Sequence, residues 1–235
     1  MQDFAAAWIE ALALLLRFDA DLAQIVLLSL QVTLSAVVAA CLLGFPLGAA
    51  LAVGRFRGRG AISVIMAALM GLPPVVVGLC VYLLLSRAGP LGVLGLLYTP
   101  TAMIIAQTVL ILPIVTTLTQ QLLEHLHREY DELLRSMGLS RWGTVATLLW
   151  DGRYGLTTAA LAGLGRAFAE VGAVMIVGGN INHVTRVMTT TIALETSRGN
   201  LALALGLGLI LILFSIAITA TLMTIRRMAE ARAYV

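Results

Sequence analysis

No charged residue occurs between Asp21 and Arg55, and this apolar stretch is long enough to cross a lipid bilayer. A transmembrane helix needs about 20 mostly apolar residues, because a rise of about 1.5 Å per residue must span about 30 Å of hydrocarbon. Five segments of the chain meet this condition. We expect membrane-spanning helices over about residues 22–53, 60–85, 101–123, 155–178 and 201–225.

The composition argues against a soluble globular domain. Of the 235 residues, 60% are hydrophobic and only 11% are charged, whereas a soluble domain carries about 25% charged residues. Part of the surface must therefore face lipid. The sequence predicts an all-α, polytopic membrane protein with five transmembrane helices, forming one membrane domain over residues 22–225.

The arginines indicate which side of the membrane each loop occupies. Cytoplasmic loops collect Lys and Arg, and every basic residue of this chain is Arg. They concentrate in three regions that five crossings would place on one side: Arg55, Arg57, Arg59, Arg128, Arg135, Arg141, Arg153, Arg226, Arg227 and Arg232. We expect the N-terminus outside, with an extracytoplasmic surface helix within residues 1–21 (about 4–18), and a cytoplasmic tail at 226–235.

The residues do not indicate a catalytic centre, a metal site or a cofactor. Cys41 and Cys80 lie inside apolar runs, and we expect both to be free and buried. His125, His127 and His183 lack the clustered thiols and histidines of a zinc site. A G-x-x-x-x-G-K-[ST] phosphate loop needs a lysine, and the chain has none.

The segment 124–153, between the third and fourth spans, carries an amphipathic pattern. Its apolar residues are spaced by four, three and four, as on one face of a helix: Leu126, Tyr130, Leu133 and Met137. Gly138 is expected to end this helix in the left-handed conformation. Ser140 is expected to cap a second, shorter helix that begins near Arg141. An ordered loop of this length with an exposed Trp142 indicates a docking surface, although a solvated connector is the alternative.

This segment resembles the conserved cytoplasmic motif of type I ABC importer permeases, in which Glu-Ala-Ala is followed after three residues by Gly. Leucines replace both alanines, and the Leu-Pro that closes the family motif falls at Trp150 and Asp151. The resemblance implies the type I permease fold, with this element docked in a groove of the nucleotide-binding subunit. The implied coupling residues are Glu129, Glu132, Leu133, Leu134, Gly138, Ser140, Arg141 and Trp142.

Longer stretches resemble the permeases of molybdate and tungstate importers. These are GLPPVVVGLCVYLLL at 71–85 and GRAFAEVGAVMIVGGNI at 165–181. With SRAGPLG at 86–92 and TTTIALETSRGNLALALGLG at 189–208, the chain is most similar to the tungstate branch. The resemblance implies an inner-membrane permease that imports tungstate, with a cytoplasmic ATPase dimer and a periplasmic or lipid-anchored oxyanion-binding protein as partners. Five helices are too few to enclose a path, so we expect a homodimer in the lipid bilayer.

Two charged residues and two prolines are candidates for the translocation pathway or the subunit interface. Arg166 and Glu170 are four residues apart in the fourth span, so on one helix they would share a face and pair. A purely structural ion pair, without a role in the pathway, is an equally good interpretation. Pro73 and Pro74 interrupt the second span and free a backbone carbonyl. A simple kink is the alternative there.

Thr189, Thr190 and Thr191 form a third candidate group, because hydroxyls can hydrogen-bond an oxyanion; Thr also commonly caps helices. The nearest alternative function is the same machine with molybdate as cargo. An ion-driven secondary transporter would show two repeated halves, and no repeat is visible. A membrane-embedded enzyme would need reactive groups at membrane depth, and a nucleic-acid partner is not expected.

Overall fold

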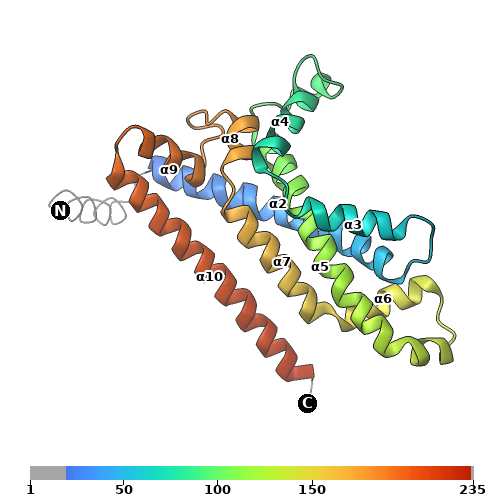
Figure 1. Cartoon of the computed structure of the whole chain (residues 1–235). Helices are drawn as coiled ribbons and strands as arrows, with labels where there is room; N and C mark the ends of the chain where they lie inside the picture. The colour runs from blue at the N-terminus through green and yellow to red at the C-terminus, as the bar shows by residue number, and fades with distance from the viewer. Residues whose placement is uncertain (1–19, 234–235) are drawn as a thin grey trace. The chain divides into compact units, whose positions relative to one another are not determined.

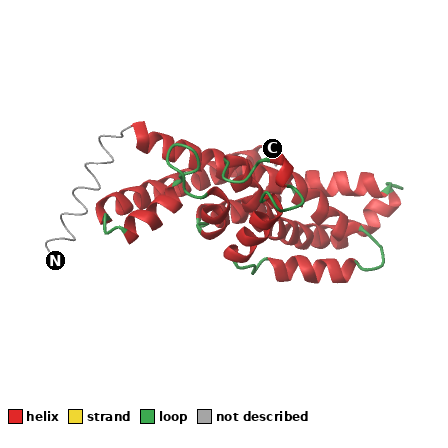
Figure 2. Cartoon of the chain, turned by 90° about the horizontal axis from the view of Figure 1, so that it is seen from above, coloured by secondary structure: helices red, strands yellow, loops and turns green. Residues whose placement is uncertain are grey.

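The computed structural model describes residues 20–233, with side chains described to residue 228. This part of the chain consists of helices joined by loops and contains no β-strand (Figure 2). The predicted all-α fold is therefore confirmed. The helices are α2 (Ala20–Val53), α3 (Arg59–Leu69), α4 (Pro74–Leu85), η1 (Gly92–Leu94), α5 (Pro100–Ser136), α6 (Arg141–Asp151), α7 (Arg153–Phe168), α8 (Gly172–Gly178), α9 (Met188–Ser197) and α10 (Leu201–Ala233). The helix predicted over residues 4–18 lies outside the described residues.

The apolar helices coincide with the five predicted spans. Three helices, α2, α5 and α10, are each long and apolar enough to cross a membrane (Figure 1). The other two spans are bent pairs, α3 with α4 and α7 with α8, whose members are inclined by 108° and 62°. The described residues therefore contain three unbroken candidate spans, or five if each bent pair counts as one.

The break between α3 and α4 is the one that the sequence predicted. Pro73 and Pro74 provide no N–H groups for a helical ladder, and a proline disfavours the helical conformation of the residue before it. Pro73 is extended, with φ −63° and ψ 125°, and Pro74 is the first residue of α4. A single proline is not sufficient, because Pro46 lies inside α2 and Pro113 inside α5 without ending either helix.

The break between α7 and α8 was not predicted. The apolar run over 155–178 indicated a continuous helix, but α7 ends at Phe168 and α8 begins at Gly172, with no proline between them. Packing explains the new direction of the chain, because α8 lies against α4. A Cβ atom on Gly78 of α4 would lie 2.8 Å from the Cα atom of Ala173, so glycine is required for this close approach.

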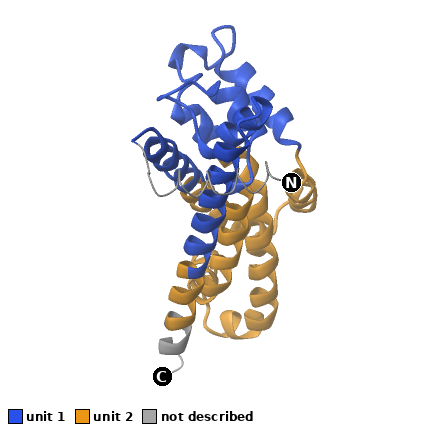
Figure 3. Ribbon diagram, turned by 90° about the vertical axis from the view of Figure 1, so that its left-hand side faces the viewer, with its two compact units in different colours: residues 1–36, 73–107, 167–220 blue, residues 37–72, 108–166, 221–235 orange. Residues whose placement is uncertain are grey.

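The chain divides into two compact units, shown in different colours in Figure 3. Within the described residues, unit 1 contains 20–36, 73–107 and 167–220. It therefore holds α4, α8, α9, the beginnings of α2 and α5, and most of α10. One hydrophobic cluster of this unit is centred on Met188 and Leu207, which are fully buried.

Unit 2 contains residues 37–72, 108–166 and the chain from 221 onward. It holds α3, α6, most of α5 and α7, and the remainder of α2 and α10. Its helices α2 and α5 approach closely at Gly44 and Gly48, where a Cβ on Gly48 would lie 2.6 Å from Thr119 Cβ. Small residues four apart permit such contact in lipid, where burial of apolar surface gives little drive for helix association.

The two cysteines are free, as predicted, but the predicted burial is wrong. Cys41 is half-buried and Cys80 is exposed. Cys80 lies on α4, where Leu79 and Leu83 are also more than half exposed. An apolar helix face in a membrane can be covered by lipid or by another subunit, so apolar character alone does not predict burial within one chain.

Candidate functional site

The end of α5 and the beginning of α6 form the first candidate site, and both lie in unit 2. α5 has 37 residues and runs without a break from the predicted third span into the predicted cytoplasmic segment. At 1.5 Å per residue this helix is roughly 55 Å long, about 25 Å more than the hydrocarbon thickness. One end of α5 must therefore project beyond the membrane.

The inward face of this projecting helix differs in part from the prediction. Leu126 and Tyr130 pack against the unit 2 core, as expected, but the next inward residue is the buried Leu134. Leu133 and Met137, which the spacing placed on the same apolar face, are 58% and 62% exposed, so only part of that face packs against the core. Steps of four residues hold the row Leu126, Tyr130 and Leu134 against the core, and Met137 follows the last residue of α5.

The turn between α5 and α6 has the predicted local structure. Gly138 has φ +64°, its N–H donates to the carbonyl of Arg135, and the N–H of Leu139 donates to the carbonyl of Leu134. These two bonds define a Schellman motif, which satisfies the last carbonyls of a helix. Ser140 then caps α6, with its Oγ accepting a hydrogen bond of 3.2 Å from the N–H of Gly143. Both predictions are confirmed.

Helix α6 buries one face and exposes a tryptophan. Thr144 and Leu148 are buried, and Leu148 joins the unit 2 core beside Leu123 and Leu134. Trp142 is 84% exposed, as predicted. A tryptophan left open next to a rigid turn provides a large apolar contact for another molecule. Glu129, Glu132 and Arg141 are also exposed.

A polar network that the sequence did not predict fastens α3 to α5 within unit 2. Arg59 forms an ion pair with Glu124. Gln120 donates from Nε2 to Glu124 Oε1 at 2.9 Å and to Ser63 Oγ at 2.8 Å. The two contacts between α3 and α5 join residues that are 57 and 65 positions apart in the sequence. No local sequence pattern could therefore reveal this network.

The second candidate site lies in unit 1, at the beginning of α8. Glu170 is only 1% exposed, and its Oε1 accepts a hydrogen bond of 2.8 Å from the N–H of Ala173. A carboxylate in this position satisfies an orphan N–H group and complements the positive end of the helix dipole. Because α7 ends at Phe168, Arg166 and Glu170 do not share one helix face, so that premise is wrong. Their pairing stays a prediction.

Pro74 and Gly172, the first residues of α4 and α8, lie side by side. A Cβ on Gly172 would be 3.7 Å from Pro74 Cβ and 3.2 Å from Val75 Cγ2. The two broken spans thus begin their second helices at one place in unit 1. Pro73 precedes this contact as the N-cap of α4, and its carbonyl accepts hydrogen bonds from Val76 and Val77.

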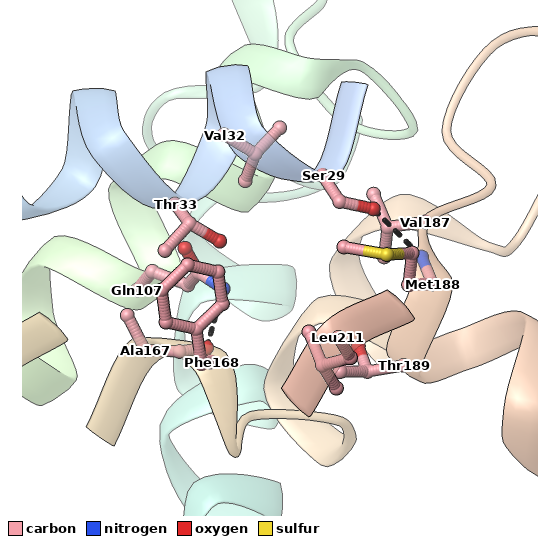
Figure 4. Close-up of a pocket in the computed structure, with 10 residues that line it drawn as sticks. All are labelled: Ser29, Val32, Thr33, Gln107, Ala167, Phe168, Val187, Met188, Thr189 and Leu211. Carbon is pink, nitrogen blue, oxygen red and sulfur yellow. Dashed lines mark hydrogen bonds between the residues drawn. The ribbon is translucent and has the colours of Figure 1, made fainter. Parts of the chain in front are cut away.

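A small pocket with four polar and six apolar lining residues lies elsewhere in unit 1 (Figure 4). Its polar residues come from α2, α5 and α9: Ser29, Thr33, Gln107 and Thr189. Its volume of about 10 Å³ is sufficient for roughly one water molecule. Gln107 is 4% exposed and donates from Nε2 to the carbonyl of Ala167 at 3.4 Å, and its Oε1 has no partner among the described residues. Gln107 was missed, although an amide in an apolar span was a usable signal.

The three consecutive threonines of α9 do not act as one group. Thr190 is fully buried, and its Oγ1 lies 2.9 Å from Asn180 Oδ1 and 3.0 Å from the carbonyl of Val187. Thr191 donates to the same carbonyl at 2.7 Å. Only Thr189 lines the pocket of Figure 4. The expectation of three hydroxyls gathered for a ligand is therefore wrong, because two of them close the first turn of α9.

Comparison with known proteins gives matches over most of the chain. Residues 44–233 match the family model described as the binding-protein-dependent transport system inner membrane component. The tungstate uptake system permease protein TupB of Peptoclostridium acidaminophilum is 38% identical over 226 residues, which cover 96% of this chain and 99% of that protein. A probable anion ABC transporter permease protein of Haloferax volcanii is 38% identical over 185 residues, covering 77% and 80% of the two chains.

A third relative is more distant. The molybdenum transport system permease protein ModB of Azotobacter vinelandii is 30% identical over 180 residues, which cover 73% of this chain and 79% of that protein. The family match and the apolar helices both indicate a multi-pass protein of the inner membrane. This chain belongs to the family of binding-protein-dependent transport system inner membrane components and has the type I ABC importer permease fold.

Proposed function

We propose that this chain is the membrane-spanning permease subunit of an ATP-driven ABC importer whose cargo is tungstate. The observation that carries the proposal is its 38% identity, over nearly the full length of both chains, to a permease named for tungstate uptake. The stretches at 86–92, 166–181 and 189–208 support it, since together they resemble the tungstate branch. ATP hydrolysis is assigned to a separate subunit, because a Walker loop requires a lysine and this chain has none.

The α5–α6 turn is proposed to receive the ATPase subunit in the cytoplasm. Its support is physical: the Schellman motif and the Ser140 cap give a fixed turn, and Trp142 is exposed beside it. A fixed turn transmits a displacement, whereas a mobile connector absorbs it. The segment 124–153 and the tail after residue 226 would then be cytoplasmic, and closure of an ATPase dimer would move α6.

A homodimer is proposed because one subunit leaves long apolar faces uncovered. On α4, Val75, Leu79 and Leu83 are each more than half exposed. A path on the two-fold axis between two copies would use one such face from each subunit, and lipid would cover the others. An oxyanion-binding protein would deliver cargo to the outer loops, where Val93 is 95% exposed.

Glu170 is proposed to support the pathway without contacting the cargo. A carboxylate repels an oxyanion, and this one is occupied by the N–H of Ala173. Neutral hydroxyl and amide groups suit a passing anion better, because they donate hydrogen bonds without holding it by full charge. Four lining residues of the pocket in Figure 4 carry such groups: Ser29, Thr33, Gln107 and Thr189. Opening of that pocket would make Gln107 and Thr189 pathway residues.

The cargo is tested by uptake in cells. Deletion of this chain is expected to lower intracellular tungsten, measured by mass spectrometry at limiting external tungstate, and the wild-type chain should restore it. Excess molybdate should compete weakly. If tungsten uptake is unchanged by the deletion and molybdenum uptake falls instead, the chain is a molybdate permease and the tungstate proposal is wrong. Loss of neither would contradict the transport function.

The topology is tested by cysteine labelling. In a variant with Cys41 and Cys80 replaced by alanine, we expect Val93→Cys to react with a membrane-impermeant maleimide from the outside of intact cells. Met137→Cys, which is 62% exposed in the wild-type position, should react only after the membrane is opened. Val93 and Met137 are both exposed within the subunit. A difference in their labelling would therefore report the side of the membrane on which each lies. Labelling of both from the same side would contradict the orientation with the N-terminus outside.

A further inference from the structure

A basic pocket lies beside the α5–α6 turn, entirely within unit 2. It has a volume of about 180 Å³. Its walls come from three places in the sequence: the end of α2, the last turns of α5, and the first turn of α6 with the residue before Ser140. The lining residues are Val53, Arg55, His127, Asp131, Leu134, Arg135, Leu139, Arg141 and Thr144.

The charges of this pocket are not balanced. Arg135 is engaged by Asp131, with Nε to Oδ1 at 2.9 Å and a second nitrogen to Oδ2 at 2.8 Å. Among the described residues, neither Arg55 nor Arg141 has an ion pair or a hydrogen bond from its side chain. Three arginines against one aspartate leave an excess of two positive charges, counting His127 as neutral.

A further feature of the pocket favours an anion. The pocket adjoins the N-terminus of α6, a helix of 11 residues, because Arg141 and Thr144 lie in its first turn. The positive end of a helix dipole and its unpaired N–H groups attract anions.

We propose that this pocket binds a tetrahedral oxyanion of the phosphate class, supplied by a phospholipid headgroup or by a free oxyanion. Its volume of about 180 Å³ is more than ten times the roughly 10–15 Å³ that one water molecule needs by the same measure, which is enough for an anion of five heavy atoms. Guanidinium groups match the geometry of such oxygens and hold them by paired, charge-assisted hydrogen bonds. Arg55 and Arg141 are the principal ligands, and Arg135 stays with Asp131.

A bound oxyanion connects two parts of the chain, α2 and α6, that also pack together in the unit 2 core. It bridges Arg55, just after α2, to Arg141, the first residue of α6. The anion thereby fixes the position of α6 relative to the end of its neighbouring span. Such a contact would inhibit or stabilise the coupling of α6 to the ATPase, and this regulatory role rests on the proposed function of α6. The binding of the anion does not depend on that function.

Binding is tested with the purified full-length chain in a neutral detergent. Inorganic phosphate and tungstate are titrated separately, and the midpoint of thermal unfolding is followed. We expect either anion to raise the midpoint of the wild type. Arg55→Gln and Arg141→Gln should each need roughly tenfold more anion for the same shift, because one charge-assisted contact is lost. Arg57→Gln is the matched control, since Arg57 is exposed nearby and does not line the pocket.

A second experiment, with lipids, distinguishes a phospholipid headgroup from a free oxyanion as the ligand. The same variants are reconstituted in phosphatidylcholine alone or mixed with phosphatidylglycerol, and retained lipid is counted by native mass spectrometry. A headgroup ligand predicts that Arg55→Gln and Arg141→Gln lose phosphatidylglycerol and Arg57→Gln keeps it. A free ligand predicts differences only in the phosphate or tungstate titration. If neither arm distinguishes the two pocket variants from Arg57→Gln, the pocket binds no oxyanion.

An acidic side chain of the ATPase is the competing occupant. In that case the wild-type chain binds phosphate in the absence of the ATPase and loses it when the ATPase is added. This result would overturn the proposal. Retention of phosphate or lipid in the assembled complex supports it. Because these measurements need no transport, a failure to import tungstate would contradict the proposed function and leave the pocket result intact.

Discussion

Replacement of Gly138 by valine is expected to abolish tungsten uptake while leaving the subunit inserted in the membrane. Gly138 has φ +64°, a conformation that costs a β-branched residue about 1–3 kcal/mol. A Cβ at this position would meet no atom within 4 Å, so the penalty is in the backbone and not in packing. The turn relieves it by shifting, and α6 moves from the place where the ATPase would dock.

Gly138→Asn is the matched control, because asparagine tolerates the left-handed conformation far better than valine. Uptake and co-purification of the ATPase should be near normal for Asn and lost for Val. Trp142→Ala should weaken ATPase binding roughly 30-fold, as expected for an exposed aromatic anchor worth about 2 kcal/mol. Trp142→Phe should retain most of it. Normal uptake by both Gly138→Val and Trp142→Ala would mean that the α5–α6 turn is only a connector.

Replacement of Glu170 by leucine is expected to give the largest loss of stability. Glu170 is buried, and its Oε1 accepts the N–H of Ala173 at the beginning of α8. Leucine has a similar volume but no acceptor, so a buried N–H is left without its bond. The loss of a charge-assisted hydrogen bond corresponds to about 1.5–3 kcal/mol. The thermal unfolding midpoint of the purified chain should fall accordingly, and less protein should elute as a single species in gel filtration.

Glu170→Gln separates the capping role from the role of the charge. Its side-chain carbonyl can accept the same hydrogen bond, so its midpoint should lie nearer the wild type than that of Glu170→Leu. A loss as large as that of leucine would show that the negative charge itself is required. A double-mutant cycle with Arg166→Ala then tests the predicted pairing. Sub-additive losses would support a coupled pair, and strictly additive losses would exclude it.

Local sequence patterns were sufficient for several features of the candidate sites. The break at Pro73 and Pro74, the positive φ of Gly138 and the cap at Ser140 were all predicted. Each depends on the covalent structure of one residue or on hydrogen bonds to neighbours within a few positions. The exposure of Trp142 was also expected, because it follows a cap in a segment with many charges.

Predictions that depended on the surroundings of a helix were less reliable. The spacing placed Leu133 with Leu126 and Tyr130 on one apolar face, yet Leu134 is the residue buried beside them. The spacing permitted either, and contact with the unit 2 core decided between them. Thr190 and Thr191 were read as available hydroxyls, but the carbonyl of Val187 accepts from both. Both hydrogen bonds form because α9 begins at Met188. Apolar periodicity does not reveal this boundary.

The sequence by itself determined that this chain crosses a membrane, where its apolar spans lie, and how the α5–α6 turn closes. Long uncharged runs, tandem proline and a Gly–Ser turn act over distances of a few residues, so their consequences can be calculated locally. Only the tertiary structure decided that α7 ends before Glu170, that Arg59 meets Glu124, and that Gln107 reaches the carbonyl of Ala167. In an apolar chain each buried polar group takes whichever partner the packing of distant helices brings within reach.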